Sequence, residues 1–244
     1  VGAGHACCEA AASAANMGCK TLLVTMSLQN IAQMSCNPAM GGIAKGQIVR
    51  EIDALGGYSG IVSDKTAIQF KMLNKSKGPA MWSPRVQSDR MRFAEEWRLM
   101  LENTPNLDFY QEMVKGLLIK DNKIEGVVTS LGIEIKAKTV VLTNGTFLNG
   151  LIHIGEKQFG GGRAGESAAF GITEDLKKVG FEAGRMKTGT PPRVDGRSLD
   201  YSKMREEPGD EIPDKFSYSD ETKPLIHQKL CHMTYTSLDV HDIL

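Results

Sequence analysis

Hydrophobic and polar residues follow a turn, helix, strand and helix order near the start of the chain. An alanine-rich stretch within residues 2–17 predicts a helix that opens at glycines. The apolar run 21–25 predicts a short buried strand, and a loop over 26–42 follows it. Apolar residues at helical spacing then predict a second helix with one apolar face, formed by Ile43, Ile48, Ile52 and Leu55. The turn, the first helix and the strand make one half of a doubly wound βαβ unit.

The middle of the chain changes from a helical period to short strands. The spacing of Met91, Ala94, Trp97 and Leu101 predicts a helix over 86–101. Four short runs predict a β-meander, and they are residues 107–114, 117–119, 124–129 and 133–136. A largely apolar run at 139–143 predicts a buried parallel strand. Beyond Arg193 the chain is polar with scattered prolines, so we place a domain boundary near Pro191 and Pro192.

Composition places the chain among ordinary globular proteins. Its 244 residues are 41% hydrophobic and 24% charged, which excludes a disordered tail, a collagen-like repeat and a disulfide scaffold. No apolar run approaches the roughly 20 residues of a membrane span, so we expect no membrane association. Five cysteines without a CxxC pair predict reduced thiols in a cytoplasmic protein. The chain opens at Val1, inside a motif that should follow a strand, which predicts a fragment lacking its first strand.

Charge is unevenly distributed, although 29 basic and 29 acidic residues cancel. Residues 71–92 hold six basic side chains and one acidic side chain, a net charge of +5. Residues 200–221 hold three basic and eight acidic side chains, a net charge of −5. The zero sum therefore conceals a segment able to meet phosphates, although such a run more commonly forms a solvated surface.

The spacing Gly2-x-Gly4-x-x-Cys7 is typical of a dinucleotide-binding turn. The first glycine permits the tight turn, and the second lets N–H groups at the helix N-terminus approach a pyrophosphate. The third position usually holds Gly or Ala, and an ordinary glycine turn before a helix is the alternative. The acidic residue that commonly binds a ribose is replaced by Thr25-Met26-Ser27.

Two further glycine-containing segments bear on the cofactor. The strand predicted at 139–143 continues as Asn144-Gly145, and a strand ending in Thr-x-Gly after a β-meander recurs in flavoproteins with two dinucleotide-binding folds. An ordinary strand exit gives the same pattern. Together with the turn at residues 2–7, it favours FAD over NAD as the tightly held cofactor. The glycines around Arg163 suit either a planar or anionic ligand or a mobile loop.

Cys36 is the candidate reactive thiol. It lies in a loop of small residues before the helix expected from Gly42, with Lys45 in the first helical turn, and both features favour a thiolate. A buried, inert thiol is the alternative, and that role suits Cys7, Cys8 and Cys19 better. The five histidines are scattered, so we predict no metal site.

Several blocks of sequence resemble the GidA/MnmG family of FAD-dependent tRNA wobble-uridine modification enzymes. The most specific are Ser-Cys-Asn-Pro at 35–38, within the block 33–46, and Lys-Thr-Gly-Thr-Pro-Pro-Arg at 187–193. The others are residues 2–6, 51–57, 68–70, 76–80 and 145–155. The resemblance implies an α/β, Rossmann-like flavoprotein fold with two dinucleotide-binding domains in the whole enzyme. This chain would be its amino-terminal portion, with an incomplete FAD-binding domain at 1–192 and the start of an inserted α/β domain at 193–244.

The resemblance also implies the chemistry and the partners. NADH reduces FAD, and the reduced flavin takes a one-carbon unit from methylenetetrahydrofolate and transfers it to C5 of the wobble uridine. Glycine or ammonium then completes the carboxymethylaminomethyl or aminomethyl group. A tRNA anticodon loop suits this reaction because its unpaired bases can be splayed into a pocket. The family works as a homodimer with the MnmE GTPase. The second family cysteine and the nicotinamide-binding segment would lie beyond Leu244, so we expect this portion alone to be inactive.

The resemblance assigns roles to individual residues. Cys36 matches one of two family cysteines implicated in catalysis. Val114 matches a position whose backbone meets the FAD adenine, and Ala169 matches an FAD contact that is usually serine. The FAD-binding turn comprises Gly2, Ala3, Gly4, His5, Ala6 and Cys7. Two alternatives stay open: a folate- and FAD-dependent tRNA uridine-C5 methyltransferase, which the block at 33–46 disfavours, and a non-catalytic FAD-domain fragment.

Overall fold

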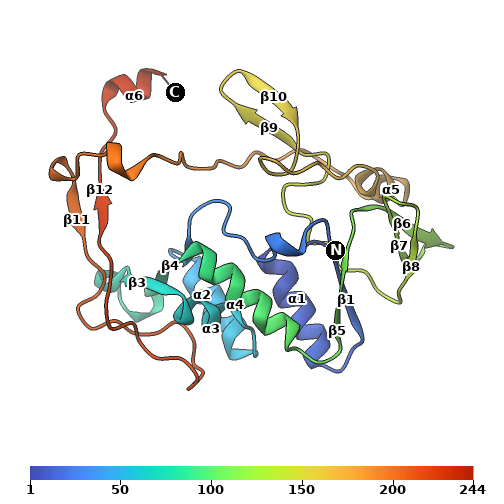
Figure 1. The fold of residues 1–244 in the computed structure, drawn as a ribbon, viewed down its shortest axis with the longest axis horizontal. Coiled ribbons are helices and arrows are strands. Elements are labelled where there is room, and N and C mark those ends of the chain that lie inside the picture. Colours follow the sequence, from blue (N-terminus) through green and yellow to red (C-terminus); the bar gives the residue numbers. More distant parts are fainter. Residues whose placement is uncertain (244) are drawn as a thin grey trace. The chain divides into compact units, whose positions relative to one another are not determined.

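The first elements of the chain are those that the sequence predicts. The computed structural model describes residues 1–243 (Figure 1). Helix α1 (His5–Asn16) follows the glycine turn, and strand β1 (Thr21–Thr25) follows the helix. β1 pairs in parallel with β5 (Leu107–Gln111). Parallel strands with a helix before them confirm the predicted α/β, Rossmann-like class.

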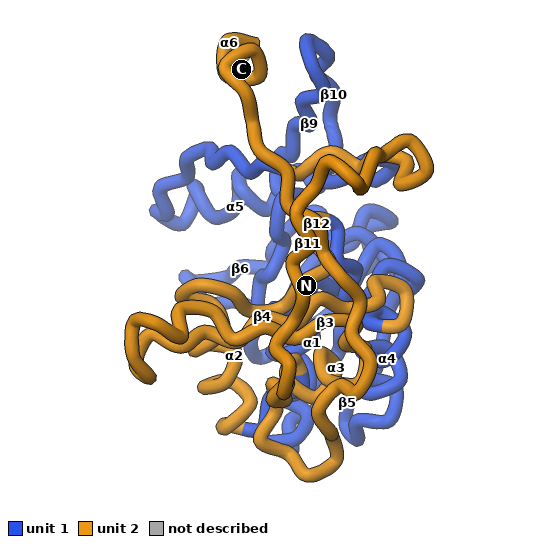
Figure 2. Tube along the Cα trace, turned by 90° about the vertical axis from the view of Figure 1, so that its left-hand side faces the viewer, with its two compact units in different colours: residues 1–35, 56–58, 93–189 blue, residues 36–55, 59–92, 190–244 orange. Residues whose placement is uncertain are grey.

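Two compact units make up the chain, coloured separately in Figure 2. The first comprises residues 1–35, 56–58 and 93–189. The second comprises residues 36–55, 59–92 and 190–244. The second unit therefore combines early segments of the chain with residues from 190 onward. These units divide the chain differently from the expected domains at 1–192 and 193–244, and that domain assignment stays a prediction.

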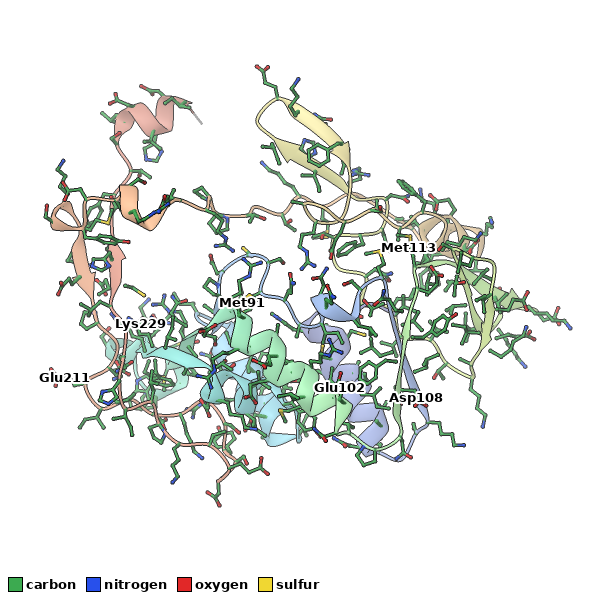
Figure 3. All side chains as sticks on the ribbon, viewed as in Figure 1. Met91, Glu102, Asp108, Met113, Glu211 and Lys229 are labelled. Atoms are coloured by element: carbon green, nitrogen blue, oxygen red, sulfur yellow. The ribbon has the colours of Figure 1, made fainter. Side chains whose placement is uncertain are left out.

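The β-meander of the first unit is present, but the strand predicted at 107–114 is two strands. β5 ends at Gln111, and β6 (Val114–Lys120) pairs with β7 (Lys123–Thr129), which pairs with β8 (Glu134–Lys136). Met113, labelled in Figure 3, lies where the chain leaves one sheet for the other. The chain changes partner there, because β5 pairs with β1 and β6 pairs with β7. The core around the meander contains Val24, Val114, Val127 and Ile172.

The parallel strand predicted at 139–143 is not a strand in the structure. Its backbone bonds to Val1, whose ammonium donates to the Val141 carbonyl at 2.8 Å. The Thr143 N–H donates to the Val1 carbonyl at 3.1 Å, and the Gly2 N–H donates to Val24 of β1 at 2.9 Å. The segment thus follows the backbone of Val1, and the next residue, Gly2, bonds to β1.

Helix α4 (Arg90–Glu102) begins later than the predicted 86–101 because residues 86–88 belong to strand β4. Its buried side chains are Phe93, Trp97 and Leu101, whereas Met91 is exposed at its first turn (Figure 3). Three further elements of the first unit were not predicted. They are the antiparallel hairpin β9 (Leu151–Ile154) and β10 (Lys157–Gly160), and helix α5 (Ile172–Lys178).

A three-stranded antiparallel sheet organises the second unit. Its order is β2 (Ala39–Gly41), β4 (Ser83–Ser88) and β3 (Ala67–Leu73). Helices α2 (Lys45–Ala54) and α3 (Ser59–Lys65) accompany it. After residue 190 come β11 (Arg205–Glu207), which pairs with β12 (Cys231–Met233), and α6 (Leu238–Ile243). Within residues 1–243, no helix is long and apolar enough to cross a membrane.

The apolar face predicted for α2 is wrong. Ile43, Ile48 and Leu55 are exposed and Ile52 is half-buried, whereas the residues that α2 buries are Gly46 and Val49. The cause is close packing through the glycine, since a Cβ on Gly46 would lie 2.5 Å from the Pro84 carbonyl oxygen. Contact with β4 therefore selects a face of α2 that its apolar spacing does not mark.

Candidate functional site

The two glycines of the amino-terminal turn, Gly2 and Gly4, occupy their positions for different structural reasons. Gly2 has φ +107°, and a Cβ there would lie 2.8 Å from the Thr143 carbonyl oxygen, so the turn itself requires glycine. Gly4 is extended, with φ −74° and ψ 178°, and a Cβ on it would meet nothing within 4 Å. Conformation therefore does not require glycine at this position, and the open space beside it suits the close approach of a ligand.

The N-terminus of α1 faces that open space without a cap. Gly4 offers no side chain, and the first turn of the helix holds no acidic residue. The first N–H groups of a helix have no partner within the helix, and they carry the positive end of its dipole. Such an end binds phosphate groups. The residues present therefore fit the pyrophosphate of a dinucleotide, although occupancy by FAD stays a prediction.

Cys7, at the third position of the dinucleotide-binding turn, is a packing residue. Cys7 is 5% exposed and Cys8 is fully buried, as expected for packing thiols, whereas Ala6 is exposed. Burial raises the pKa of the Cys8 thiol, and its Sγ lies 3.6 Å from the Ala3 carbonyl oxygen. Cys8 is therefore a protonated packing residue. Cys19, which was also expected to pack, is exposed because it follows the end of α1.

His5 holds the following loop against the turn. Its Nε2 lies 3.1 Å from the Ala32 carbonyl oxygen, and its ring packs edge-on to Phe93 at 5.3 Å between centroids. Burial lowers the pKa of His5, so the neutral ring donates through Nε2. The Ala32 N–H in turn donates to the Ala3 carbonyl at 2.7 Å. Ala3 and His5, both in the dinucleotide-binding turn, thus hold the loop around Ala32 through hydrogen bonds.

A polar network ties the same loop to the glycine-rich segment around Arg163. The Glu166 carboxylate accepts from Asn30 Nδ2 and, at 2.6 Å, from Arg163 Nη2. Gln33 Nε2 donates to Asn30 Oδ1 at 2.6 Å. The guanidinium of Arg163 is therefore paired, and the loop that carries it is held rather than loose. Sequence spacing gave no sign of Glu166 or Asn30, because 136 positions separate them.

Val114 and Ala169, the two further expected FAD contacts, lie in the interior of the first unit. Val114 is 3% exposed and belongs to the core around the meander. Ala169 is 4% exposed; its N–H donates to Phe147 at 2.8 Å, and its carbonyl accepts from Asn149 at 2.9 Å. Its methyl group offers no polar contact at the position where the resemblance predicts serine. Their roles toward FAD stay predictions.

The Glu112 carboxylate lies close to the end of β1, after which the sequence has no acidic residue at the usual ribose-binding position. The Glu112 N–H donates to the Thr25 carbonyl at 2.8 Å, which places Glu112 at the carboxyl end of the strand next to β1. The Ser130 hydroxyl and the Met113 N–H hold the pKa of Glu112 below its usual range. Dinucleotide-binding folds commonly bind a ribose through an ionised carboxylate near the carboxyl ends of their strands. Glu112 lies far from Thr25 in the sequence, so the spacing after β1 does not point to it, and a role toward a ribose stays a prediction.

Cys36 lies in the second unit, on a loop held by its backbone. The thiol is exposed, which excludes the buried alternative. The Arg193 guanidinium donates to the Cys36 carbonyl through Nη2, and the Ser88 N–H donates to the Pro38 carbonyl at 2.8 Å. Strand β2 stands between this loop and α2, which begins at Lys45 rather than Gly42. Cys36 thus does not directly precede the helix, and its catalytic role stays a prediction.

The basic segment 71–92 is partly neutralised by the acidic segment 200–221. Lys71 Nζ lies 2.7 Å from Glu207 Oε2, and Lys75 Nζ lies 2.9 Å from Asp210 Oδ2. Two of the six cations are therefore paired within the second unit, so the expected basic face is smaller than its net charge of +5 indicated. In the described part of the chain, no three His, Cys, Asp or Glu side chains gather as metal ligands would.

Known proteins match this chain along its whole length. The family model described as glucose inhibited division protein A matches residues 1–244. The tRNA uridine 5-carboxymethylaminomethyl modification enzymes MnmG of Flavobacterium johnsoniae and Cytophaga hutchinsonii are 86% and 72% identical over 244 residues. Both alignments include the whole of this chain, which spans only 39% of the length of each relative.

Solved structures give the same result for the fold. Aquifex aeolicus GidA superposes with a TM-score of 0.94 at 48% identity, over 99% of this chain and 41% of that chain. A GidA-related protein from Thermus thermophilus superposes with a TM-score of 0.53 at 24% identity, over 75% of this chain and 67% of that chain. The second likeness concerns the fold alone.

Proposed function

Since the chain belongs to the glucose inhibited division protein A family, we propose that it forms the FAD-binding part of an enzyme that modifies the wobble uridine of tRNA. The chain spans about 39% of the curated relatives, so the activity is proposed for the whole protein. The observation that carries the proposal is the uncapped N-terminus of α1 beside the open space at Gly4.

The first unit supplies the cofactor site in this proposal. The turn at Gly2 and Gly4 presents the first N–H groups of α1 to the FAD pyrophosphate. Glu112 binds the adenosine ribose in place of the acid absent after β1. Val114 and Ala169 contact the cofactor through backbone and methyl groups only. His5 keeps the loop around Ala32 in place, so the turn is ordered before the cofactor arrives.

The second unit supplies the thiol. When bound, FAD supplies the redox chemistry that moves a one-carbon unit from methylenetetrahydrofolate to C5 of uridine, with NADH as reductant. Cys36 presents an exposed thiol, which we assign as the nucleophile or proton-handling group at the uridine. Glycine as the amine donor completes a carboxymethylaminomethyl group, and ammonium completes an aminomethyl group. The names of the relatives give the carboxymethylaminomethyl group for those proteins.

The substrate and partners follow from the same proposal. The anticodon loop of tRNA is the substrate, because an unpaired base can leave its stack to reach the reacting atoms. We further propose that the protein works in the cytoplasm as a homodimer with the MnmE GTPase.

A colour and spectrum test examines the cofactor. Protein purified from its own cells should carry a flavin absorbance spectrum, and NADH should bleach it under anaerobic conditions. The matched variant Gly4→Val should purify folded but with far less flavin, because its side chain fills the open space beside the helix end. A colourless wild-type protein, or full flavin content in Gly4→Val, would contradict the proposed site.

A further inference from the structure

The loop that carries Cys36 has little regular structure of its own and depends on backbone anchors. Residues 35–38 directly precede strand β2, and Cys36 and Asn37 are exposed. The Ser88 N–H of β4 anchors the Pro38 carbonyl at 2.8 Å. The Arg193 guanidinium anchors the Cys36 carbonyl. The second anchor acts on the reactive residue itself.

Arg193 reaches this carbonyl from a segment without helix or strand. Residues 181–195 form coil, and their side chains are almost all exposed. Ordering a long, exposed arginine costs side-chain entropy, and an exposed polar contact contributes little to folding in return. We therefore infer that the contact between Arg193 and the Cys36 carbonyl fixes the position of the Cys36 backbone rather than stabilising the fold.

The position of the backbone is especially important for a reactive cysteine, because it determines where the sulfur can lie. One torsion separates its Cα from Sγ, so a fixed backbone restricts the sulfur to three staggered positions. A held carbonyl at Cys36 thus decides where the thiol can be presented. By contrast, the reacting groups of long side chains such as lysine can compensate for backbone movement through several torsions.

We propose that Arg193 is a positioning residue for the Cys36 thiol in the uridine modification reaction. It holds the Cys36 carbonyl, fixes the direction of the Cα–Cβ bond and so sets the thiol at the reacting base. The inference rests on the proposed function, in which Cys36 meets the uridine. Arg193 itself takes no part in bond making, and a donor of similar length should replace it in part.

Steady-state kinetics of tRNA modification test this role. Arg193→Met should lower kcat about tenfold or more, since a misplaced reacting group is costly in rate. KM for tRNA should stay within about twofold, because the ground-state contacts are unchanged. Arg193→Lys should recover much of the lost kcat, since an ammonium can donate to the same carbonyl. Hydrogen exchange of the peptide containing Cys36 should quicken in Arg193→Met and return toward wild type in Arg193→Lys.

Two controls separate this inference from its premise. Arg197→Met removes a neighbouring exposed arginine that bonds Asp195, and it should leave kcat and local exchange unchanged. Cys36→Ser should abolish turnover. If Cys36→Ser is inactive while Arg193→Met keeps wild-type kcat, the positioning role is overturned and the proposed function stands. If Cys36→Ser is active, the thiol's role fails, and the positioning role fails with it. Equal losses in Arg193→Met and Arg193→Lys without a change in exchange also overturn it.

Discussion

The carbonyl of Val1 accepts two hydrogen bonds from Thr143, one from its backbone N–H at 3.1 Å and one from its hydroxyl at 2.8 Å. These bonds join the residue before the glycine turn to the Thr-x-Gly motif. The two sequence patterns that favoured FAD are therefore parts of one structure in the first unit. The fold explains why they occur together: the threonine holds the backbone from which the turn begins.

Thr143→Val should lower the free energy of unfolding by about 1 kcal/mol, because it removes the hydroxyl bond but retains the backbone bond. Urea denaturation measures the change. Thr139→Val is the matched control, since Thr139 is exposed. An equal loss in both variants would show that the hydroxyl bond to Val1 contributes nothing.

Gly2→Ala should mainly weaken folding, whereas Gly4→Ala should mainly weaken cofactor binding. Gly2→Ala should destabilise the protein by about 1–3 kcal/mol, because its φ is +107° and its Cβ would strike Thr143. Gly4→Ala should leave the apoprotein's stability within about 0.5 kcal/mol of wild type. It should nevertheless weaken FAD binding by narrowing the phosphate approach. Chemical denaturation and FAD titration measure the two effects, and similar destabilisation by both variants would contradict this division.

Glu166→Gln should speed FAD dissociation severalfold, because a neutral amide pairs less strongly with Arg163 and loosens the loop from Asn30. Stopped-flow release of the flavin measures the rate. Glu156→Gln is the control, since Glu156 is an exposed carboxylate in the turn of the β9–β10 hairpin. Unchanged release in Glu166→Gln would mean that the network does not reach the cofactor.

His5 should make the stability of the first unit fall in mild acid. Burial lowers its pKa below 6.5, so between pH 6.5 and that lower value the unfolded chain binds a proton that the folded chain does not. Its contribution is therefore complete above pH 6.5 and is lost progressively below it. His5→Gln keeps a donor for Ala32 without titrating and should flatten this part of the profile. Chemical denaturation of both proteins at several pH values measures the free energy of unfolding. If its dependence on pH is the same in His5→Gln as in wild type, His5 is excluded as the cause.

Local elements were predictable from the sequence, and contacts between distant segments were not. The helix after Gly4 and the strand at 21–25 depend on their own residues, so spacing and glycine placement located them. The run at 139–143 has strand-like composition and bonds to Val1 through its backbone, but it is not a strand in the structure. Forming a strand depends on a partner segment, which composition does not report.

The same reason explains the errors at the candidate site. α2 packs Gly46 against β4, so Ile48 of the predicted apolar face is exposed, and no periodicity marks a glycine as the packing position. Glu166 and Asn30 meet across 136 positions. The acidic segment pairs with Lys71 and Lys75, so a charge count along the chain overstated the basic surface. Each error concerns a partner supplied by folding.

Nucleoside mass spectrometry of tRNA tests the central claim most directly. Cells lacking the gene, and those complemented with Cys36→Ser, should lose the 5-carboxymethylaminomethyl-type wobble uridines, whereas wild-type complementation should restore them. Normal wobble uridines in the cells lacking the gene would contradict the account. Loss of 5-methyluridine instead would identify the protein as a uridine-C5 methyltransferase, and restoration by Cys36→Ser would remove Cys36 from the reaction.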